Sequence, residues 1–158
     1  MDANTKRIMH IRVKNTIKNL EANNMKAVYV ETKEEALTLV KSIVEKGAYT
    51  ATGGSMTLRE CGIYQYLETE TDLHTDAREA YGASYFLLSA NAITEHGEIF
   101  QVDGRSNRVS AMLFGPEKVI VVAGINKLVP SMRDAAVRVK NTAAPINATR
   151  LSMDSPCT

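Results

Sequence analysis

The run Lys118–Ala123 constrains the fold more than any other part of the sequence. After the lysine it contains only Val, Ile and Ala, so no position in it is suited to face water. A continuous apolar run of this length is typical of a strand buried on both faces. We therefore expect a mostly parallel sheet with helices on both of its faces.

Strands and helices are expected to alternate along the rest of the chain. Apolar patterning predicts further strands over Lys26–Val30, Ala48–Thr52 and Ala83–Ser89, and a hairpin that turns at His96-Gly97. Helices are predicted over Thr5–Asn23 and Asn107–Phe114, and another from Ser131 onward. Two more are predicted to begin at capping boxes: one at Thr32–Glu35, which ends at Gly47, and one at Thr57–Glu60. The stretches Glu68–Arg78 and Thr142–Thr158 are expected to be a loop and an extended tail. The order predicts an α/β fold, a three-layer α/β/α sandwich with an inserted β-hairpin.

Length and composition narrow the class of protein. A chain of 158 residues is expected to form a single domain. Nineteen basic against eighteen acidic residues leave a net charge of +1, which argues against a nucleic acid or a membrane as partner. No apolar run approaches the length of a membrane span, and the first residues are polar, so we expect a soluble cytoplasmic protein. The oligomeric state stays open, a homo-oligomer included.

The first predicted helix, within residues 1–23, is amphipathic and basic. Its exposed side carries several cations opposed only by Glu21, namely Lys6, Arg7, Arg12, Lys14 and Lys18. Such a face is either a solvated surface or a docking surface for an anionic partner.

Loops that follow strands are the expected place for a ligand, because open α/β sheets bind ligands at the carboxyl ends of their strands. Three such loops, and a polar turn after the hairpin, offer glycines and side chains suited to a small anion. These candidate ligand-binding residues are Gly53, Gly54, Ser55, Met56, Thr57, Asn91, Thr94, Asp103, Asn107, Arg108, Gly124, Asn126 and Lys127. For the first loop a capped tight turn, and for Lys127 an exposed loop lysine, are the plain alternatives.

Glu95 is the candidate for catalysis, as a general acid or base or as a nucleophile. The neighbouring His96 is expected to form the hairpin turn. Neither a Ser-His-Asp nor a Cys-His arrangement is present, and the three histidines show no metal-ligand spacing. The two cysteines, Cys61 and Cys157, are too few for a disulfide scaffold or a four-ligand metal site.

The same loops resemble a known family. The segments that carry the resemblance are Gly53–Leu58, Ser89–Glu98, Asp103–Met112, Gly124–Pro130 and Ala143–Leu151. In this order they resemble the lactate-utilisation (LUD) domain family over nearly the whole chain. The resemblance implies a fold of the sugar-phosphate-isomerase and CoA-transferase type. It also implies a part in bacterial oxidation of lactate to pyruvate, beside iron–sulfur partner subunits, with a small anionic metabolite as ligand.

The chain departs from the family pattern in two places. Many relatives continue past a Pro-Cys pair into a cysteine-rich tail suited to an iron–sulfur cluster, so Cys157 would be a metal ligand only with such a tail. We expect no cofactor within this chain, because one thiolate cannot hold a cluster. The stretch between Leu67 and Ala83 is shorter than in relatives.

Two alternative functions stay open. One is an enzyme that acts on a phosphorylated sugar, folate or acyl-CoA, by analogy of fold alone. The other is a non-catalytic interaction subunit.

Overall fold

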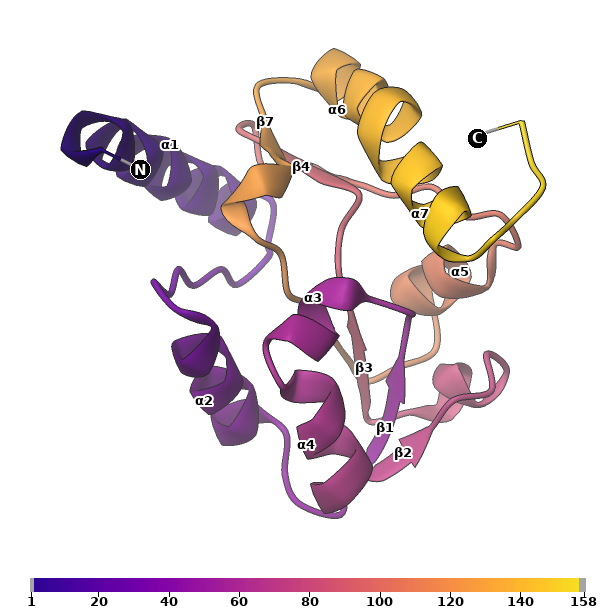
Figure 1. Cartoon of the computed structure of the whole chain (residues 1–158). Helices are drawn as coiled ribbons and strands as arrows, with labels where there is room; N and C mark the ends of the chain where they lie inside the picture. Colours follow the sequence, from indigo (N-terminus) through magenta and orange to yellow (C-terminus); the bar gives the residue numbers. More distant parts are fainter. Residues whose placement is uncertain (1, 157–158) are drawn as a thin grey trace. The chain divides into compact units, whose positions relative to one another are not determined.

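The chain forms two compact units, each assembled from separate segments. The computed structural model describes residues 2–156. The sheet unit comprises residues 30–89 and 102–124, and the hairpin unit comprises the described residues 2–29, 90–101 and 125–156. The chain passes from one unit to the other after residues 29, 89, 101 and 124. Figure 1 follows the chain through both.

The sheet unit contains a parallel sheet of four strands in the order β2-β1-β3-β6. Its strands are β1 (Tyr49–Thr52), β2 (Asp72–His74), β3 (Tyr85–Leu88) and β6 (Lys118–Val121). All three pairings are parallel. The predicted α/β class with a mostly parallel sheet is therefore confirmed.

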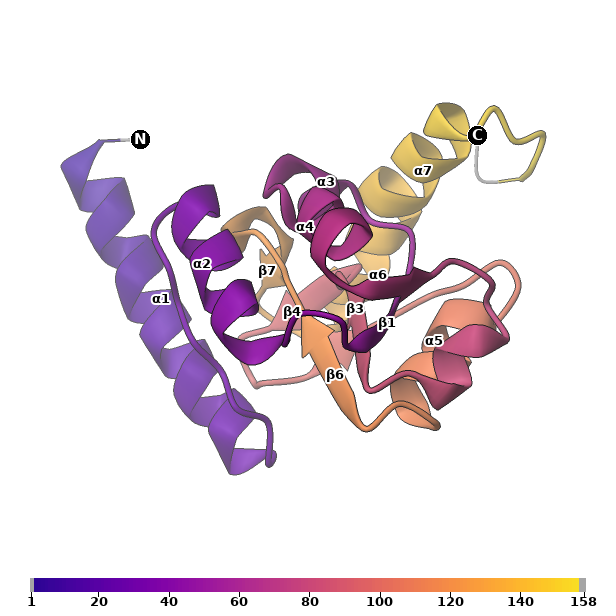
Figure 2. The ribbon, with the colours of Figure 1, turned by 90° about the horizontal axis from the view of Figure 1, so that it is seen from below.

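Helices cover both faces of this sheet. All four residues of β3 are buried, and alternate side chains point to opposite faces. Tyr85 and Leu87 pack among residues of α2 (Lys33–Ile43), α3 (Met56–Glu60) and α4 (Ile63–Glu70). Phe86 and Leu88 pack against the 3₁₀ helix η1 (Glu79–Gly82) and α5 (Asn107–Leu113). Figure 2 shows α5 on the opposite side of the sheet from α2, α3 and α4, so the three-layer prediction is confirmed.

Helix caps in the sheet unit follow the sequence closely, with two corrections. Thr32 and Glu35 form the predicted capping box of α2. The helix ends at Ile43, however, and Gly47 takes its left-handed conformation (φ 74°) in the turn that follows. The helix predicted to open at the Thr57 capping box begins instead after Ser55, whose hydroxyl accepts from the N–H of Leu58. A Ser two residues earlier provides the same type of cap.

The predicted strands need three corrections. The segment Lys26–Val30 forms no strand with any part of the described chain, and Val28 is 68% exposed. β6 is an edge strand with Val119 37% exposed, not a strand buried on both faces. β2 lies within the stretch predicted to be a loop. Asp72 and His74 in it are polar, and only Leu73 packs against the core, because β2 forms the other edge of the sheet, where one side of the strand faces solvent.

The hairpin unit is built on a small mixed sheet in the order β5-β4-β7. β4 (Ala92–Thr94) and β5 (Ile99–Phe100) are antiparallel and form the predicted hairpin, whereas β4 and β7 (Leu128–Val129) are parallel. The short 3₁₀ helix η2 (Ile125–Lys127) precedes β7. The buried cluster of this unit is small, and it consists of Ala92, Val129 and Ala135, with Phe100 packed against it.

Helices at both ends of the chain belong to the hairpin unit. The predicted first helix is confirmed as α1 (Ala3–Ala22). The tail predicted to be extended is wrong from residue 142 to 150. There, α6 (Met132–Arg138) continues through the π-helical turn η3 (Val139–Ala143) into α7 (Ala144–Arg150). The proline in the first turn of α7 directly follows this π-helical turn. Among the described residues, no helix combines the length and the apolar character that crossing a membrane requires.

Candidate functional site

The residues predicted to bind a ligand divide between the two units. The sheet unit holds Gly53, Gly54, Ser55, Met56, Thr57, Asp103, Asn107, Arg108 and Gly124, and the hairpin unit holds Asn91, Thr94, Glu95, Asn126 and Lys127. Within each unit the structure brings some of them together. The two groups differ in how their charges are paired.

In the sheet unit, Arg108 is the centre of a closed cluster. Its Nε donates to Oδ1 of Asp103 at 2.9 Å, and its Nη2 donates to the carbonyl oxygen of Val102 at 2.8 Å. The Asp103 side chain is only 9% exposed, and its other oxygen accepts from the N–H of Val109 at 2.6 Å. The Arg108 charge is therefore neutralised by a buried carboxylate, and the pair fastens the start of α5.

Gly53 follows β1 and lies directly against this cluster. A Cβ at this position would come within 2.7 Å of both Cγ and Cδ of Arg108, so the site requires glycine. Arg108 also donates to the carbonyl oxygen of Ser89, at the carboxyl end of β3. Three predicted residues, Gly53, Asp103 and Arg108, thus meet where β1 and β3 end, and there they stabilise one another.

The remaining sheet-unit candidates are placed more openly. Ser55 caps α3, and Thr57 is half-buried in its first turn. Gly54, Met56, Asn107 and Gly124 are exposed. Their role in binding stays a prediction.

In the hairpin unit, Glu95 is paired with an arginine. Its Oε1 accepts from Nε of Arg12 at 2.7 Å and lies 2.6 Å from Nη2 of the same residue. The backbone of Glu95 is held as well, since its carbonyl oxygen accepts from Asn19 of α1 at 2.7 Å. A carboxylate in this arrangement fastens α1 to the hairpin turn. A catalytic role for Glu95 stays a prediction, and it would require the Arg12 pair to open.

Thr94 also serves the hairpin. It is fully buried, and its hydroxyl donates to Oε2 of Glu98 at 2.6 Å while accepting from the backbone N–H of the same residue at 3.1 Å. This reciprocal pair fixes the turn that contains His96 and Gly97, as the sequence predicts for His96. The Thr94 hydroxyl therefore lies inside the turn.

Arg138 brings together the two remaining candidate loops of the hairpin unit. From the last turn of α6, its Nη1 donates to the carbonyl oxygen of Asn91 and its Nε donates to that of Asn126 at 3.2 Å. Asn91 precedes β4, and Asn126 and Lys127 precede β7, which is the parallel neighbour of β4. One guanidinium group therefore holds together the segments that carry three predicted ligand residues.

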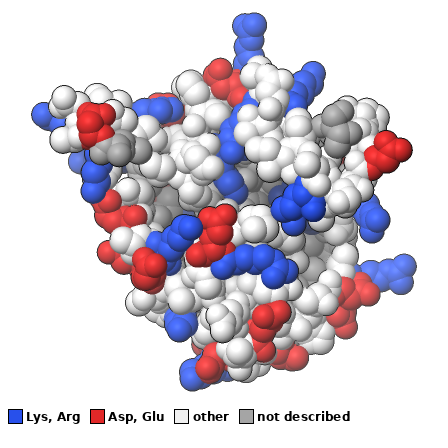
Figure 3. All heavy atoms as spheres, in the orientation of Figure 1, with Lys and Arg blue, Asp and Glu red and all other residues white. Residues whose placement is uncertain are grey.

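The charge of Arg138 has no carboxylate partner among the described residues. Its two hydrogen bonds go to neutral carbonyl groups, and it takes part in none of the ion pairs of residues 2–156. The side chain is half-buried, and burial alone lowers the pKa of the guanidinium. In the view of Figure 3, by contrast, acidic and basic side chains are largely interspersed.

Sequence reasoning missed Arg138. It lies four residues after Asp134, a spacing typical of an ion pair within one helix, which gave no reason to expect it in a site. In the structure Asp134 instead accepts from the hydroxyl of Ser131 at 2.5 Å. The one signal in the sequence is the position of Arg138 between the apolar residues Ala135 and Val139. Both of these residues are buried in the structure.

The cysteines do not fit an iron–sulfur cluster, which needs about four thiolate ligands. Cys61 is buried in the helical layer of the sheet unit, where burial raises the pKa of its thiol. Cys157 lies outside the described residues. In residues 2–156 no group of three or more His, Cys, Asp or Glu side chains is placed to hold a metal ion.

Comparison with known proteins identifies the family. A sequence model of the LUD domain matches residues 13–158, nearly the whole chain. The chain belongs to the LUD domain family. The resemblance carried by the five loop segments is thereby confirmed, and the LUD domain of this protein includes residues of both units. It is a protein of the lactate-utilisation type. Searches of curated proteins and of solved structures returned no match.

Proposed function

We propose that this LUD domain protein binds a small anionic metabolite, of the 2-hydroxy or 2-oxo acid class, and acts with iron–sulfur oxidoreductase subunits in the oxidation of lactate to pyruvate. The family supports the pathway. The observation that carries the ligand class is Arg138, a half-buried guanidinium with no carboxylate partner among the described residues.

The geometry around Arg138 suits a carboxylate. Guanidinium has five N–H donors in one plane, and the carbonyl groups of Asn91 and Asn126 accept from two of them. The other donors lie in the same plane, and the two carbonyl contacts fix the orientation of that plane. A carboxylate binds such a group through two parallel charge-assisted hydrogen bonds. The bound charge would also offset the cost of burying the cation.

Asn126 suits the second functional group of a hydroxy or oxo acid. Its carbonyl group contacts Arg138, and its exposed side chain carries an amide that can donate to a hydroxyl or keto oxygen. Arg138 would thus bind the carboxylate, and the Asn126 amide would select acids with an oxygen on the neighbouring carbon.

Titration calorimetry of the purified, reduced protein tests the ligand class. We expect heat of binding with L-lactate or pyruvate, and weaker binding of propionate, which lacks the second oxygen. Inorganic phosphate is the control for a general anion site. Equal binding of lactate, propionate and phosphate would refute selectivity for this class, and no binding of any of them would refute the site.

A further inference from the structure

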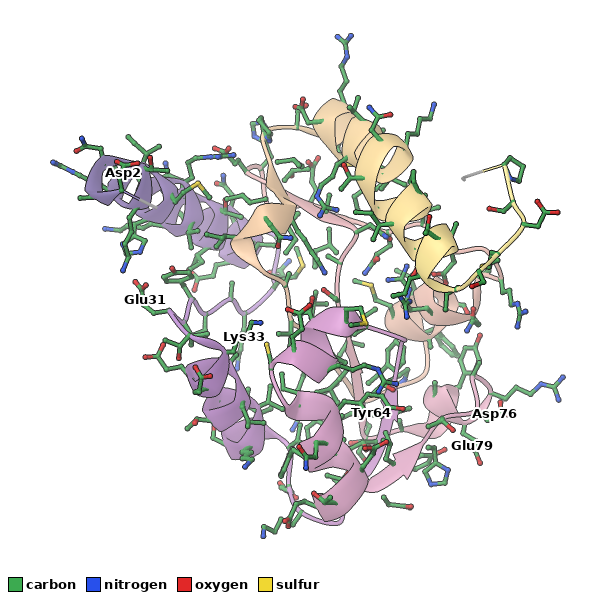
Figure 4. All side chains as sticks on the ribbon, viewed as in Figure 1. Asp2, Glu31, Lys33, Tyr64, Asp76 and Glu79 are labelled. Atoms are coloured by element: carbon green, nitrogen blue, oxygen red, sulfur yellow. The ribbon has the colours of Figure 1, made fainter. Side chains whose placement is uncertain are left out.

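Helix α1 has one face that is committed to the hairpin unit. Asp2 caps its start, where Figure 4 labels it, and Thr16 and Leu20 are buried. The amide groups of Asn19 and Asn23 donate to backbone carbonyl oxygens of the hairpin turn. These contacts, with the Arg12–Glu95 ion pair, hold the helix in a defined orientation on its own unit.

The opposite face of α1 presents a cationic stripe. Arg7, Ile11, Lys14 and Lys18 follow one another at spacings of four, three and four residues, which places them on one line along a helix. All four are exposed, and Ile11 is 50% and its neighbour Ile8 57% exposed. Beside the stripe lies a hollow of about 430 Å³, lined by Ala3, Lys6, Arg7, His10, Ile11 and Lys14.

The cations of the stripe are unlike other basic residues of the protein. Lys33, Lys46 and Arg108 each pair with a carboxylate of their own unit. In the part of the chain that the structure describes, Arg7, Lys14 and Lys18 form no ion pair. Because the whole chain carries a net charge of only +1, this concentration of positive charge is local to α1.

We propose that the stripe Arg7-Ile11-Lys14-Lys18 is a docking surface for an acidic protein partner, which presents carboxylates around an apolar side chain. The inference rests on the proposed function, in which this protein works with other subunits, and it supplies the chemistry of the contact. The partner's carboxylates would pair with the three cations, and its apolar side chain would cover Ile8 and Ile11. Paired charges around a small apolar centre are typical of protein interfaces.

A membrane or a nucleic acid fits this surface less well. Helices that bind membranes bury a broad apolar face that includes Trp, Phe or Leu, whereas the outward face of α1 offers only two isoleucines. α1 also contains no Phe, Tyr or Trp on which the bases of a single strand could stack, and a net charge of +1 on the chain is far from the strongly basic balance typical of proteins that bind duplex DNA. The observations therefore favour a protein.

The test is fluorescence anisotropy with a labelled helical peptide that carries four glutamates around one leucine. We expect the full-length protein to bind it at 25 mM NaCl, with affinity at least about tenfold weaker at 300 mM because salt screens the charges. K14E/K18E should also weaken binding at least about tenfold, and I11N should weaken it without changing the salt dependence. The matched control K41E/K140E, which changes two exposed lysines elsewhere, should bind as the wild type does.

Four results would overturn the docking proposal. The first two are that the protein does not bind the peptide, or that K14E/K18E and the control lose the same amount of peptide affinity. The other two are that a peptide with glutamine in place of glutamate binds equally well, or that the protein binds vesicles containing phosphatidylserine or duplex DNA more tightly than the peptide. Lactate calorimetry on K14E/K18E separates the two proposals. Unchanged lactate binding with lost peptide binding supports both, whereas peptide binding by a protein that binds no metabolite refutes only the proposed ligand.

Discussion

The two units of this LUD domain are stabilised in different ways. Of the nine largest fully buried side chains in residues 2–156, eight lie in the sheet unit, and only Thr94 lies in the hairpin unit. The hairpin unit relies on polar contacts made by Arg12, Asn19 and Arg138. The sheet unit therefore provides most of the apolar stabilisation, while the hairpin unit carries the charges that are suited to a ligand and a partner.

Core truncation should separate the units most clearly. Val44 in the core of the sheet unit is 1% exposed, and V44A should lower the free energy of unfolding by about 2–3 kcal/mol. V129A in the hairpin unit removes the same two methyl groups at a position 8% exposed and should cost only about 1–2 kcal/mol, because Val129 packs in a smaller buried cluster. Urea unfolding of both variants measures the difference. Equal losses would contradict the comparison.

A matched pair of glycines tests how α1 is held. Gly97 (φ 82°) and Gly47 (φ 74°) share the left-handed conformation. A Cβ at Gly97 would lie 2.5 Å from the carbonyl carbon of Asn19, whereas nothing lies within 4 Å of one at Gly47. G47A should therefore cost about 1–2 kcal/mol, and G97A about 1–3 kcal/mol more.

Urea unfolding gives both values, and hydrogen exchange shows where the damage occurs. In G97A the amides of α1 should exchange faster, and in G47A they should not. Unchanged exchange in α1 of G97A would show that the turn does not hold the helix.

Much of the sheet unit could be predicted from the sequence, because its elements follow local patterns. The Thr32–Glu35 capping box and the apolar β3 are examples. The two edge strands, β6 and β2, differ from the prediction because local patterns do not show where a strand lies in a sheet. Burial of Val119 depends on the neighbours of β6 in the sheet, and β2 has a single apolar residue, Leu73, which is too few for a pattern.

The candidate site could be predicted only in part. Asn91, Asn126 and Lys127 follow from their place in loops next to strands. Arg138 could not be predicted, because its contact with Asn91 joins residues 47 positions apart and leaves no periodic trace. Glu95 is a candidate from the sequence, but its pairing with Arg12 spans 83 positions and could not be predicted.

His74 predicts a smaller, pH-dependent effect in the sheet unit. Its Nε2 lies 3.2 Å from Asp72 and its Nδ1 3.2 Å from Glu79, which Figure 4 labels. Hydrogen bonds to Asp72 and then Glu79 raise the pKa of His74 above its usual value of 6.5. A raised pKa in the folded state means that this stabilisation is complete below pH 6.5 and is lost as the pH rises through the folded-state pKa.

Urea midpoints at pH 6.0 and pH 8.5 check this sign. The wild type should lose more stability over that interval than H74Q, and H96Q, which changes an exposed histidine in the hairpin turn, should behave as the wild type. The same pH dependence in H74Q and in the wild type would remove the ion pairs of His74 from the account.

The lactate affinity of R138Q shows whether Arg138 binds the carboxylate of the ligand. R133Q is the matched control, since Arg133 lies exposed on the same helix. Loss of charged hydrogen bonds should weaken binding by about tenfold to a hundredfold in R138Q, with no change in R133Q. If R138Q binds lactate as tightly as R133Q does, the anion is held elsewhere and the account of the site is wrong.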